Sequence, residues 1–127
     1  MFKINEDKSI YLTRGDIAVI ELSAVTSDGT DYTFKSGDVV RITVFAKKDC
    51  TEVVLQKDVQ VTQQTKTVSI NLSMRDTKIG EPISKPKDYW YEIELNPETS
   101  PQTIIGYDDE DGAKVFRLYP EGGDVDE

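Results

Sequence analysis

Near the start of the sequence, the tripeptide Arg14, Gly15 and Asp16 has the residue types of a receptor-binding motif. Cell-adhesion receptors bind this tripeptide when it lies at the tip of a protruding loop of an extracellular ligand. Here alternating apolar residues flank it on both sides, and the same Gly-Asp step recurs at Gly37 and Asp38 without an arginine. Glycine is favoured where a strand bends or bulges. We therefore interpret the tripeptide as a turn that leads into a strand, in which Gly15 is needed for stability and Arg14 is dispensable.

An acidic run from Asp108 to Asp111 could supply carboxylate oxygens, which Ca²⁺ prefers as ligands. In an EF-hand loop with Gly112 at its sixth position, Tyr107 would stand first and Leu118 twelfth, and neither carries a carboxylate. The run is better explained as the solvated turn of a hairpin. We predict no metal site and no cofactor, while cation binding by this run stays open.

Histidine is absent from the sequence, and Cys50 is its single cysteine. Nucleophilic systems that depend on histidine, thiolate zinc clusters and internal disulfides are therefore excluded. Cys50 follows Lys47 and Lys48, which would lower its pKa slightly, and we expect an unreactive free thiol. A pair of carboxylates in a pocket is the main remaining route to catalysis. We predict that the protein is not an enzyme.

The charge balance limits the partners. The 127 residues include 15 basic and 24 acidic ones, and the net charge of -9 opposes binding to nucleic acid or to a membrane surface. The first ten residues lack the apolar middle of a signal peptide, so we expect synthesis in the bacterial cytoplasm without one. The length predicts a single domain at 1–119, followed by a flexible acidic tail at 120–127.

Alternating apolar residues predict short strands along most of the chain. The clearest pattern is at 38–46, and further strands are expected at 9–13, 89–95, 102–107 and 114–119. The predicted buried faces comprise Val40, Ile42, Val44 and Ala46; Ala18, Ile20 and Leu22; Val53, Leu55, Val59 and Val61; and Val68, Ile70 and Leu72. Turn residues between these segments predict an all-β protein, an antiparallel immunoglobulin-like β-sandwich of about seven to nine strands.

At most one short helical turn is expected, at 73–80, because Ser73 and Asp76 have the spacing of a capping box. Immunoglobulin-like folds often contain a corner at which a tyrosine hydroxyl bonds back to the backbone. Asp76 with Tyr89 or Tyr91 is the candidate for a stretched version of that corner.

Charge decides which face of 89–95 is buried. Trp90 shares its face with Glu92 and Glu94, and burying two unpaired carboxylates would be strongly unfavourable. The face that carries Trp90 is therefore predicted to be the more solvent-exposed one. Phe45, in the strand at 38–46, likewise shares a face with polar residues. Because aromatic side chains on such faces can anchor protein contacts, Phe45 and Trp90 form the candidate partner-binding surface. The alternative is that the monomer itself covers both.

Short motifs follow one another in a fixed order over about residues 9–119: "LTRGD" and a second "GD" each open a strand, "DT" lies at a corner, and the aromatic segment "YWYEIEL" and a final "TI" strand follow. This order resembles the amino-terminal domain of phage baseplate upper proteins. The loop from Gly80 to Asp88 is longer than the family pattern.

This resemblance implies a non-enzymatic phage or prophage structural protein that acts as a tail or baseplate assembly or adaptor module. It implies other phage tail proteins, and further copies of the chain, as partners, and a place in the virion. The alternative is a stand-alone carbohydrate- or cell-surface-binding module, in which Trp90 would stack on sugar rings. An enzyme using paired carboxylates is a third class.

Overall fold

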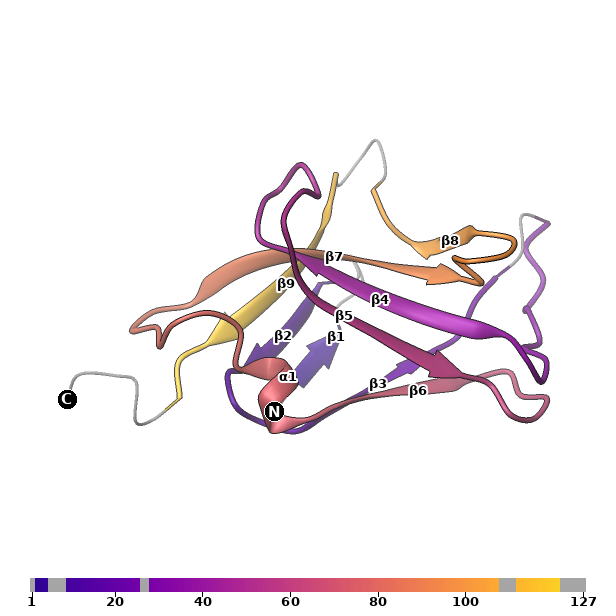
Figure 1. The fold of residues 1–127 in the computed structure, drawn as a ribbon, viewed down its shortest axis with the longest axis horizontal. Helices are drawn as coiled ribbons and strands as arrows, with labels where there is room; N and C mark the ends of the chain where they lie inside the picture. The colour runs from indigo at the N-terminus through magenta and orange to yellow at the C-terminus, as the bar shows by residue number, and fades with distance from the viewer. Residues whose placement is uncertain (1, 5–8, 26–27, 108–111, 122–127) are drawn as a thin grey trace.

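The computed structural model describes residues 2–4, 9–25, 28–107 and 112–121. These residues form a mainly β structure with one short helix (Figure 1). The elements are β1 Phe2–Ile4, β2 Ile10–Thr13, β3 Ala18–Leu22, β4 Val39–Phe45, β5 Val53–Gln60, β6 Val68–Leu72, α1 Met74–Thr77, β7 Lys87–Leu95, β8 Gln102–Ile105 and β9 Lys114–Tyr119. Among these residues no helix has the length and apolar character needed to cross a membrane.

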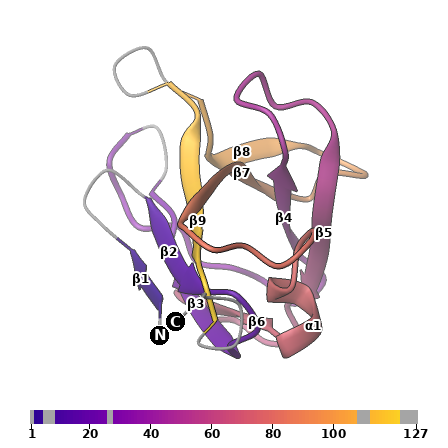
Figure 2. The ribbon, with the colours of Figure 1, turned by 90° about the vertical axis from the view of Figure 1, so that its left-hand side faces the viewer.

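The strands form a large mixed sheet and a small antiparallel one. The large sheet has the order β1-β2-β9-β7-β4-β5, with β8 added to β7, and the small sheet is the pair β3-β6. The large sheet curls into a half-barrel, and Figure 2 shows β3 and β6 lying across its lower end. The strand β7 is central, since β4, β8 and β9 all pair with it.

The prediction of a wholly antiparallel architecture is wrong at one place. β2 and β9 run parallel, with Ile10 opposite Phe116 and Leu12 opposite Leu118. Alternation in each strand places the same apolar residues on the core side whether the neighbour runs parallel or antiparallel. The sequence pattern therefore indicated both strands without indicating their relative direction. It did not indicate β1, which has only three residues.

Most predicted core faces are confirmed. Apolar residues of β3, β4, β6 and β7 point into one hydrophobic core, together with residues from β2 and β9. The central strand has the predicted polarity, with Tyr89, Tyr91, Ile93 and Leu95 buried and Trp90, Glu92 and Glu94 only partly buried.

The predicted single apolar face of β5 is wrong at its first residue. A bulge shifts the register between Val44 and Phe45, so Val44 pairs with Leu55 whereas Phe45 pairs with Val53. Val53 is consequently 54% exposed, on the side of the sheet opposite the core. Lys57 interrupts the inner face because its ammonium forms an ion pair with Asp76 of α1, at 2.5 Å.

The capping box at the start of α1 is confirmed. The Ser73 side chain accepts a hydrogen bond from the Asp76 amide at 3.2 Å, and the Asp76 carboxylate accepts one from the Ser73 amide at 2.9 Å. Asp76 also holds Lys57 of β5, and its pKa lies below the ordinary value because these hydrogen bonds outweigh the effect of burial. The predicted corner is organised differently: Asp76 binds Lys57, and the Tyr89 hydroxyl lies against Gly80.

Asp38 joins three segments at the start of β4. Its carboxylate accepts hydrogen bonds from the Tyr32 hydroxyl at 2.8 Å, the Lys35 amide at 3.0 Å and the Asn96 side chain at 3.2 Å. Asn96 in turn accepts a hydrogen bond from the Val39 amide at 2.8 Å. Burial alone would raise the pKa of Asp38, but these donors hold it below the ordinary value of 3.8. The same contact and burial raise the pKa of Tyr32 to about 12.

We expect Asp38→Asn to lower the free energy of unfolding by about 2 kcal/mol at neutral pH, because a charged hydrogen-bond acceptor is lost. The folded pKa is depressed, so the stabilisation is fully present above the ordinary value of 3.8 and is lost as the pH falls through the folded pKa. Urea unfolding, followed by the fluorescence of the single tryptophan, should therefore show the two proteins converging in acid. Asp31→Asn, at an exposed position of the same loop, should keep the wild-type profile, and an Asp38→Asn deficit that persisted in acid would contradict this account.

Candidate functional site

The two aromatic residues predicted as a surface lie directly opposite each other. Phe45 of β4 pairs with Trp90 of β7. The same register continues to Val115 of β9 and, across the bulge, to Val53 of β5. These four residues form a cross-strand row on the outer face of the main sheet, which we call the apolar row.

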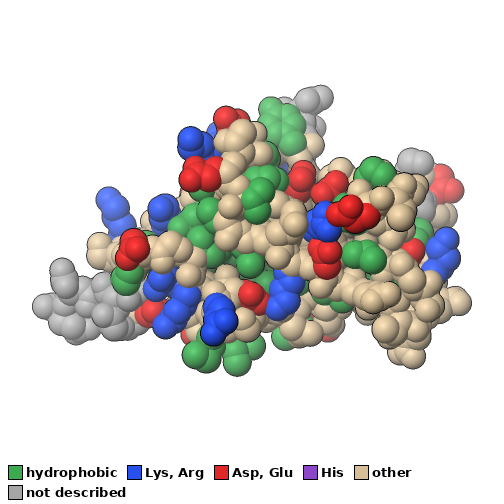
Figure 3. Space-filling view, viewed as in Figure 1, with side chains coloured by type: hydrophobic (Ala, Val, Ile, Leu, Met, Phe, Trp, Pro, Cys, Tyr) green, Lys and Arg blue, Asp and Glu red, His purple; other side chains and the backbone are tan. Residues whose placement is uncertain are grey.

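Exposure differs along the apolar row. Phe45 is only 7% exposed, whereas Trp90 and Val115 are partly buried and Val53 is exposed to solvent. Phe45 is therefore already largely covered within the monomer, and Trp90 and Val53 offer most of the accessible apolar surface. Figure 3, seen from the direction of Figure 1, shows hydrophobic side chains gathered near the middle of the view, with acidic side chains among those around them.

The turn between β4 and β5 positions one end of the row. Cys50 and Glu52 have positive φ values of 61° and 60°, which fold residues 46–52 tightly, and the Ala46 amide donates a hydrogen bond to the Glu52 carbonyl at 2.9 Å.

The expected lowering of the Cys50 pKa is wrong, since burial, Glu92 and Asp49 all raise it. Lys47 instead lies near Glu52, at 3.9 Å. Cys50 is consequently a poor nucleophile at neutral pH.

Two charged clusters flank the apolar row and are already neutralised internally. The Arg41 guanidinium binds Asp58 at 2.7 Å and Glu98 at 3.0 Å, and Arg117 binds Asp88 at 2.6 Å. Arg117 also stacks over the Tyr11 ring, 4.9 Å from its centroid. These contacts raise the pKa of both arginines further. The clusters therefore serve as structural clamps across the sheet.

Glu92 and Glu94 differ from these paired carboxylates. Both lie on the outer face of β7, two and four residues after Trp90, and Glu94 lies opposite Arg41 in the strand register. Within the described part of the chain neither carboxylate has a hydrogen-bonded or ion-paired cation, because Arg41 binds Asp58 and Glu98 instead. Burial raises the pKa of Glu92, and the nearby charge of Glu94 raises it further. An outer face that carries both an apolar row and two carboxylates without an ion pair to another described residue is suited to a partner bearing a cation.

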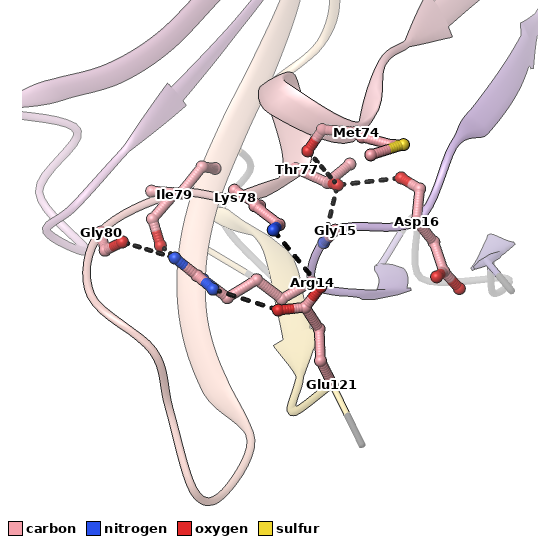
Figure 4. A network of polar contacts seen from close by, with 9 residues as sticks. All are labelled: Arg14, Gly15, Asp16, Met74, Thr77, Lys78, Ile79, Gly80 and Glu121. Atoms are coloured by element: carbon pink, nitrogen blue, oxygen red, sulfur yellow. Dashed lines mark hydrogen bonds and ion pairs between the residues drawn. The ribbon is translucent and has the colours of Figure 1, made fainter. Parts of the chain in front are cut away.

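The tripeptide Arg14, Gly15 and Asp16 is a structural corner (Figure 4). Arg14 is 6% exposed, and its guanidinium donates to the Ile79 carbonyl at 3.3 Å and the Gly80 carbonyl at 2.7 Å. It also pairs with Glu121 at 3.4 Å. The prediction that Arg14 is dispensable is therefore wrong, because this side chain ties the β2–β3 corner to the loop after α1. Sequence reasoning missed it because no local pattern distinguishes a buried arginine from an exposed one.

Thr77 completes the corner. Its hydroxyl accepts the Gly15 amide at 2.9 Å and lies within donating distance of the Asp16 carbonyl at 2.9 Å and the Met74 carbonyl at 3.2 Å (Figure 4). Thr77 is fully buried at the end of α1. The resulting contacts hold the tripeptide against the protein, so Arg14 cannot be presented to a receptor as a mobile loop would present it.

The second Gly-Asp step has the same backbone but another role. Gly15 and Gly37 have φ values of 88° and 99°, which confirms their shared turn conformation. Asp38 is buried and hydrogen-bonded, whereas Asp16 is exposed. The similarity therefore lies in the glycines, which tolerate the left-handed conformation.

Two other predictions lie partly or wholly outside the described residues. The acidic run Asp108 to Asp111 is outside them, and the described residues contain no group of three or more potential metal ligands. Of the predicted tail, residues 122–127 are also outside them, whereas Glu121 contacts both Arg14 and Lys78.

Comparison with known proteins gives no assignment. No protein-family model, no curated protein and no solved structure matches the chain. The resemblance to phage baseplate proteins therefore stays a prediction from motif order.

We expect Arg14→Ala to lower the free energy of unfolding by about 2 to 3 kcal/mol, because buried carbonyls and Glu121 lose a charged donor. Arg75→Ala is the matched control: this arginine is exposed on α1, and its loss should change stability by less than about 0.5 kcal/mol. Urea unfolding monitored by Trp90 fluorescence measures both. Equal stability of the two variants would show that the corner contributes nothing.

Substitutions at the two equivalent glycines separate backbone strain from steric conflict. A Cβ at Gly15 would lie 2.0 Å from a Glu121 carboxylate oxygen, whereas one at Gly37 would meet nothing within 4 Å. Gly37→Ala should cost about 1 to 2 kcal/mol from the left-handed backbone alone, and Gly15→Ala should cost more. Thermal unfolding of Gly15→Ala combined with Glu121→Ala should reveal partial rescue, and strictly additive losses would refute the steric explanation.

Proposed function

We propose that the protein is a non-enzymatic assembly module that joins other proteins through the outer face of its main sheet, as a tail or baseplate component of a phage or prophage. The observation that carries this proposal is the apolar row with Trp90 and Val53 accessible, on the same sheet face as Glu92 and Glu94, which form no ion pair with another described residue. Binding surfaces commonly combine an aromatic anchor with polar groups around it.

The chemistry of the side chains favours binding over catalysis. The sequence contains no histidine, and the carboxylates Asp38, Asp58 and Asp88 are engaged with donors or arginines that stabilise the fold. The raised pKa of Glu92 is a property that a general acid needs. However, Glu92 and Glu94 lie side by side on an open sheet face, whereas glycosidase carboxylates flank a bound substrate.

We base the immunoglobulin-like interpretation of the module on part of its strand order, within a main sheet that is mixed and curls into a half-barrel. The order β9-β7-β4-β5 corresponds to the G-F-C-C′ order of variable-type immunoglobulin domains, and the pair β3-β6 corresponds to strands B and E. In this correspondence β7 is strand F, and Tyr89 and Tyr91 lie near its start. The motif order shared with the amino-terminal domain of phage baseplate upper proteins supports the same relation and suggests other tail proteins as partners.

The proposal is tested by locating the protein in phage particles. In the strain that encodes the chain, a tagged copy should co-purify with particles after prophage induction, and Trp90→Ala should reduce its incorporation at least about tenfold because an interface anchor is lost. Tyr107→Ala is the matched control, since Tyr107 is an exposed aromatic residue beyond β8. Recovery of the folded protein only in the soluble fraction would overturn the proposal.

A carbohydrate-binding role predicts a different result with the same variant pair. If Trp90 stacks on sugar rings, its fluorescence should change on a glycan panel, and the Trp90→Ala protein should lose binding to immobilised glycans. Such binding without incorporation into particles would replace the assembly role by the carbohydrate one.

A further inference from the structure

A second accessible apolar surface lies beside α1. Ile17, just before β3, is 70% exposed and Met74 of α1 is 56% exposed. Together with Leu72 they line an open hollow that we call the α1 hollow. Exposed apolar residues that gather around a concave surface commonly mark a binding site.

The charge of the α1 hollow is opposite to that of the outer face. The charged residues lining it are Lys57 and Arg75, both basic. Lys57 is paired with Asp76, whereas Arg75 is exposed and has no ion pair among the described residues. Arg75 is therefore an available cation beside apolar side chains, in a protein whose net charge is -9.

The two surfaces lie at different ends of the molecule. In Figures 1 and 2 the turn between β4 and β5, which adjoins the apolar row, rises at the top, and α1 lies at the bottom. Hydrophobic side chains also protrude along the lower edge in Figure 3. One copy can therefore use either surface while the other stays accessible.

We propose that copies of this protein associate head to tail, with the outer face of one copy docked on the α1 hollow of the next. This inference rests on the proposed assembly function and specifies one partner, a second copy of the chain. Trp90 and Val53 would contact Ile17 and Met74 of the neighbour, and Glu92 and Glu94 would approach its Arg75. Contacts between two different surfaces are heterologous, so they produce rings or open filaments.

Symmetric pairing of two outer faces is disfavoured by the same charges. It would bring Glu92 and Glu94 of one copy against those of the other, and like charges placed together at an interface are costly. Docking on the α1 hollow instead places these carboxylates near a cation and covers apolar surface on both copies. Charge complementarity thus selects the heterologous arrangement.

The test uses one variant for each surface. Trp90→Ser combined with Glu92→Lys disables the outer face, and Met74→Ser combined with Arg75→Ser disables the α1 hollow without creating a charge that attracts the first variant's outer face. Sedimentation velocity of the wild-type protein should show a mass that rises with concentration, whereas each variant alone should stay monomeric. An equimolar mixture should form a dimer and nothing larger, because each variant keeps one intact surface.

Three results would overturn the inference: a wild-type protein that is monomeric at every concentration, a hollow variant that associates like wild type, or a mixture of variants that stays monomeric. Circular dichroism and urea unfolding first establish that each variant is folded. A restored-charge variant combining Glu92→Lys with Arg75→Glu should recover association that either substitution alone weakens. A monomeric protein that still enters phage particles would refute self-association while leaving the assembly function intact.

Discussion

The two carboxylates Glu92 and Glu94 constrain how the central strand can be placed. They alternate with Tyr91, Ile93 and Leu95, so the face of β7 that carries the glutamates must be accessible to solvent when the face that carries the apolar residues is buried. Since β4, β8 and β9 all pair with this strand, its orientation sets which side of the main sheet becomes core. The same constraint places Trp90 on the outer side and brings it opposite Phe45. The hydrophobic core and the candidate binding surface are thus two consequences of a single alternation.

The corner at Arg14 shows how tertiary contacts change the meaning of a short motif. Arginine, glycine and aspartate in sequence suggest a ligand for a receptor, yet Arg14 and Gly15 are held by Thr77, Gly80 and Glu121, which are distant along the chain. A buried guanidinium is tolerable only where acceptors surround it. The corner therefore requires α1 and its following loop to be formed, which couples the small sheet to the end of β9.

Local patterns predicted what depends on local chemistry. Alternation located the core faces of β3, β4 and β6, alternation together with the charges of Glu92 and Glu94 located that of β7, and the spacing of Ser73 and Asp76 located the capped helical turn. Other features depend on which segments meet in space. The parallel pairing of β2 with β9 and the effect of Glu92 on the pKa of Cys50 arise from neighbours far along the chain, and the bulge that turns Val53 outward arises from the register of the β4–β5 hairpin. The register that joins Phe45 to Trp90 belongs to the same class, because strand patterns do not specify partners.

An acidic protein can still bind its own copies if its charges are unevenly distributed. The net charge of -9 repels another copy at long range, but screening at physiological ionic strength limits that repulsion to about 8 Å. At contact, the nearest groups dominate, and these are Glu92 and Glu94 on one surface and Arg75 on the other, none of which is ion-paired with another described residue. Internal pairing of Arg41 and Arg117 matters here, because Arg41 lies opposite Glu94 yet binds Asp58 and Glu98, and Arg117 binds Asp88. The clamps that hold the sheet together therefore engage these two arginines with carboxylates other than Glu92 and Glu94.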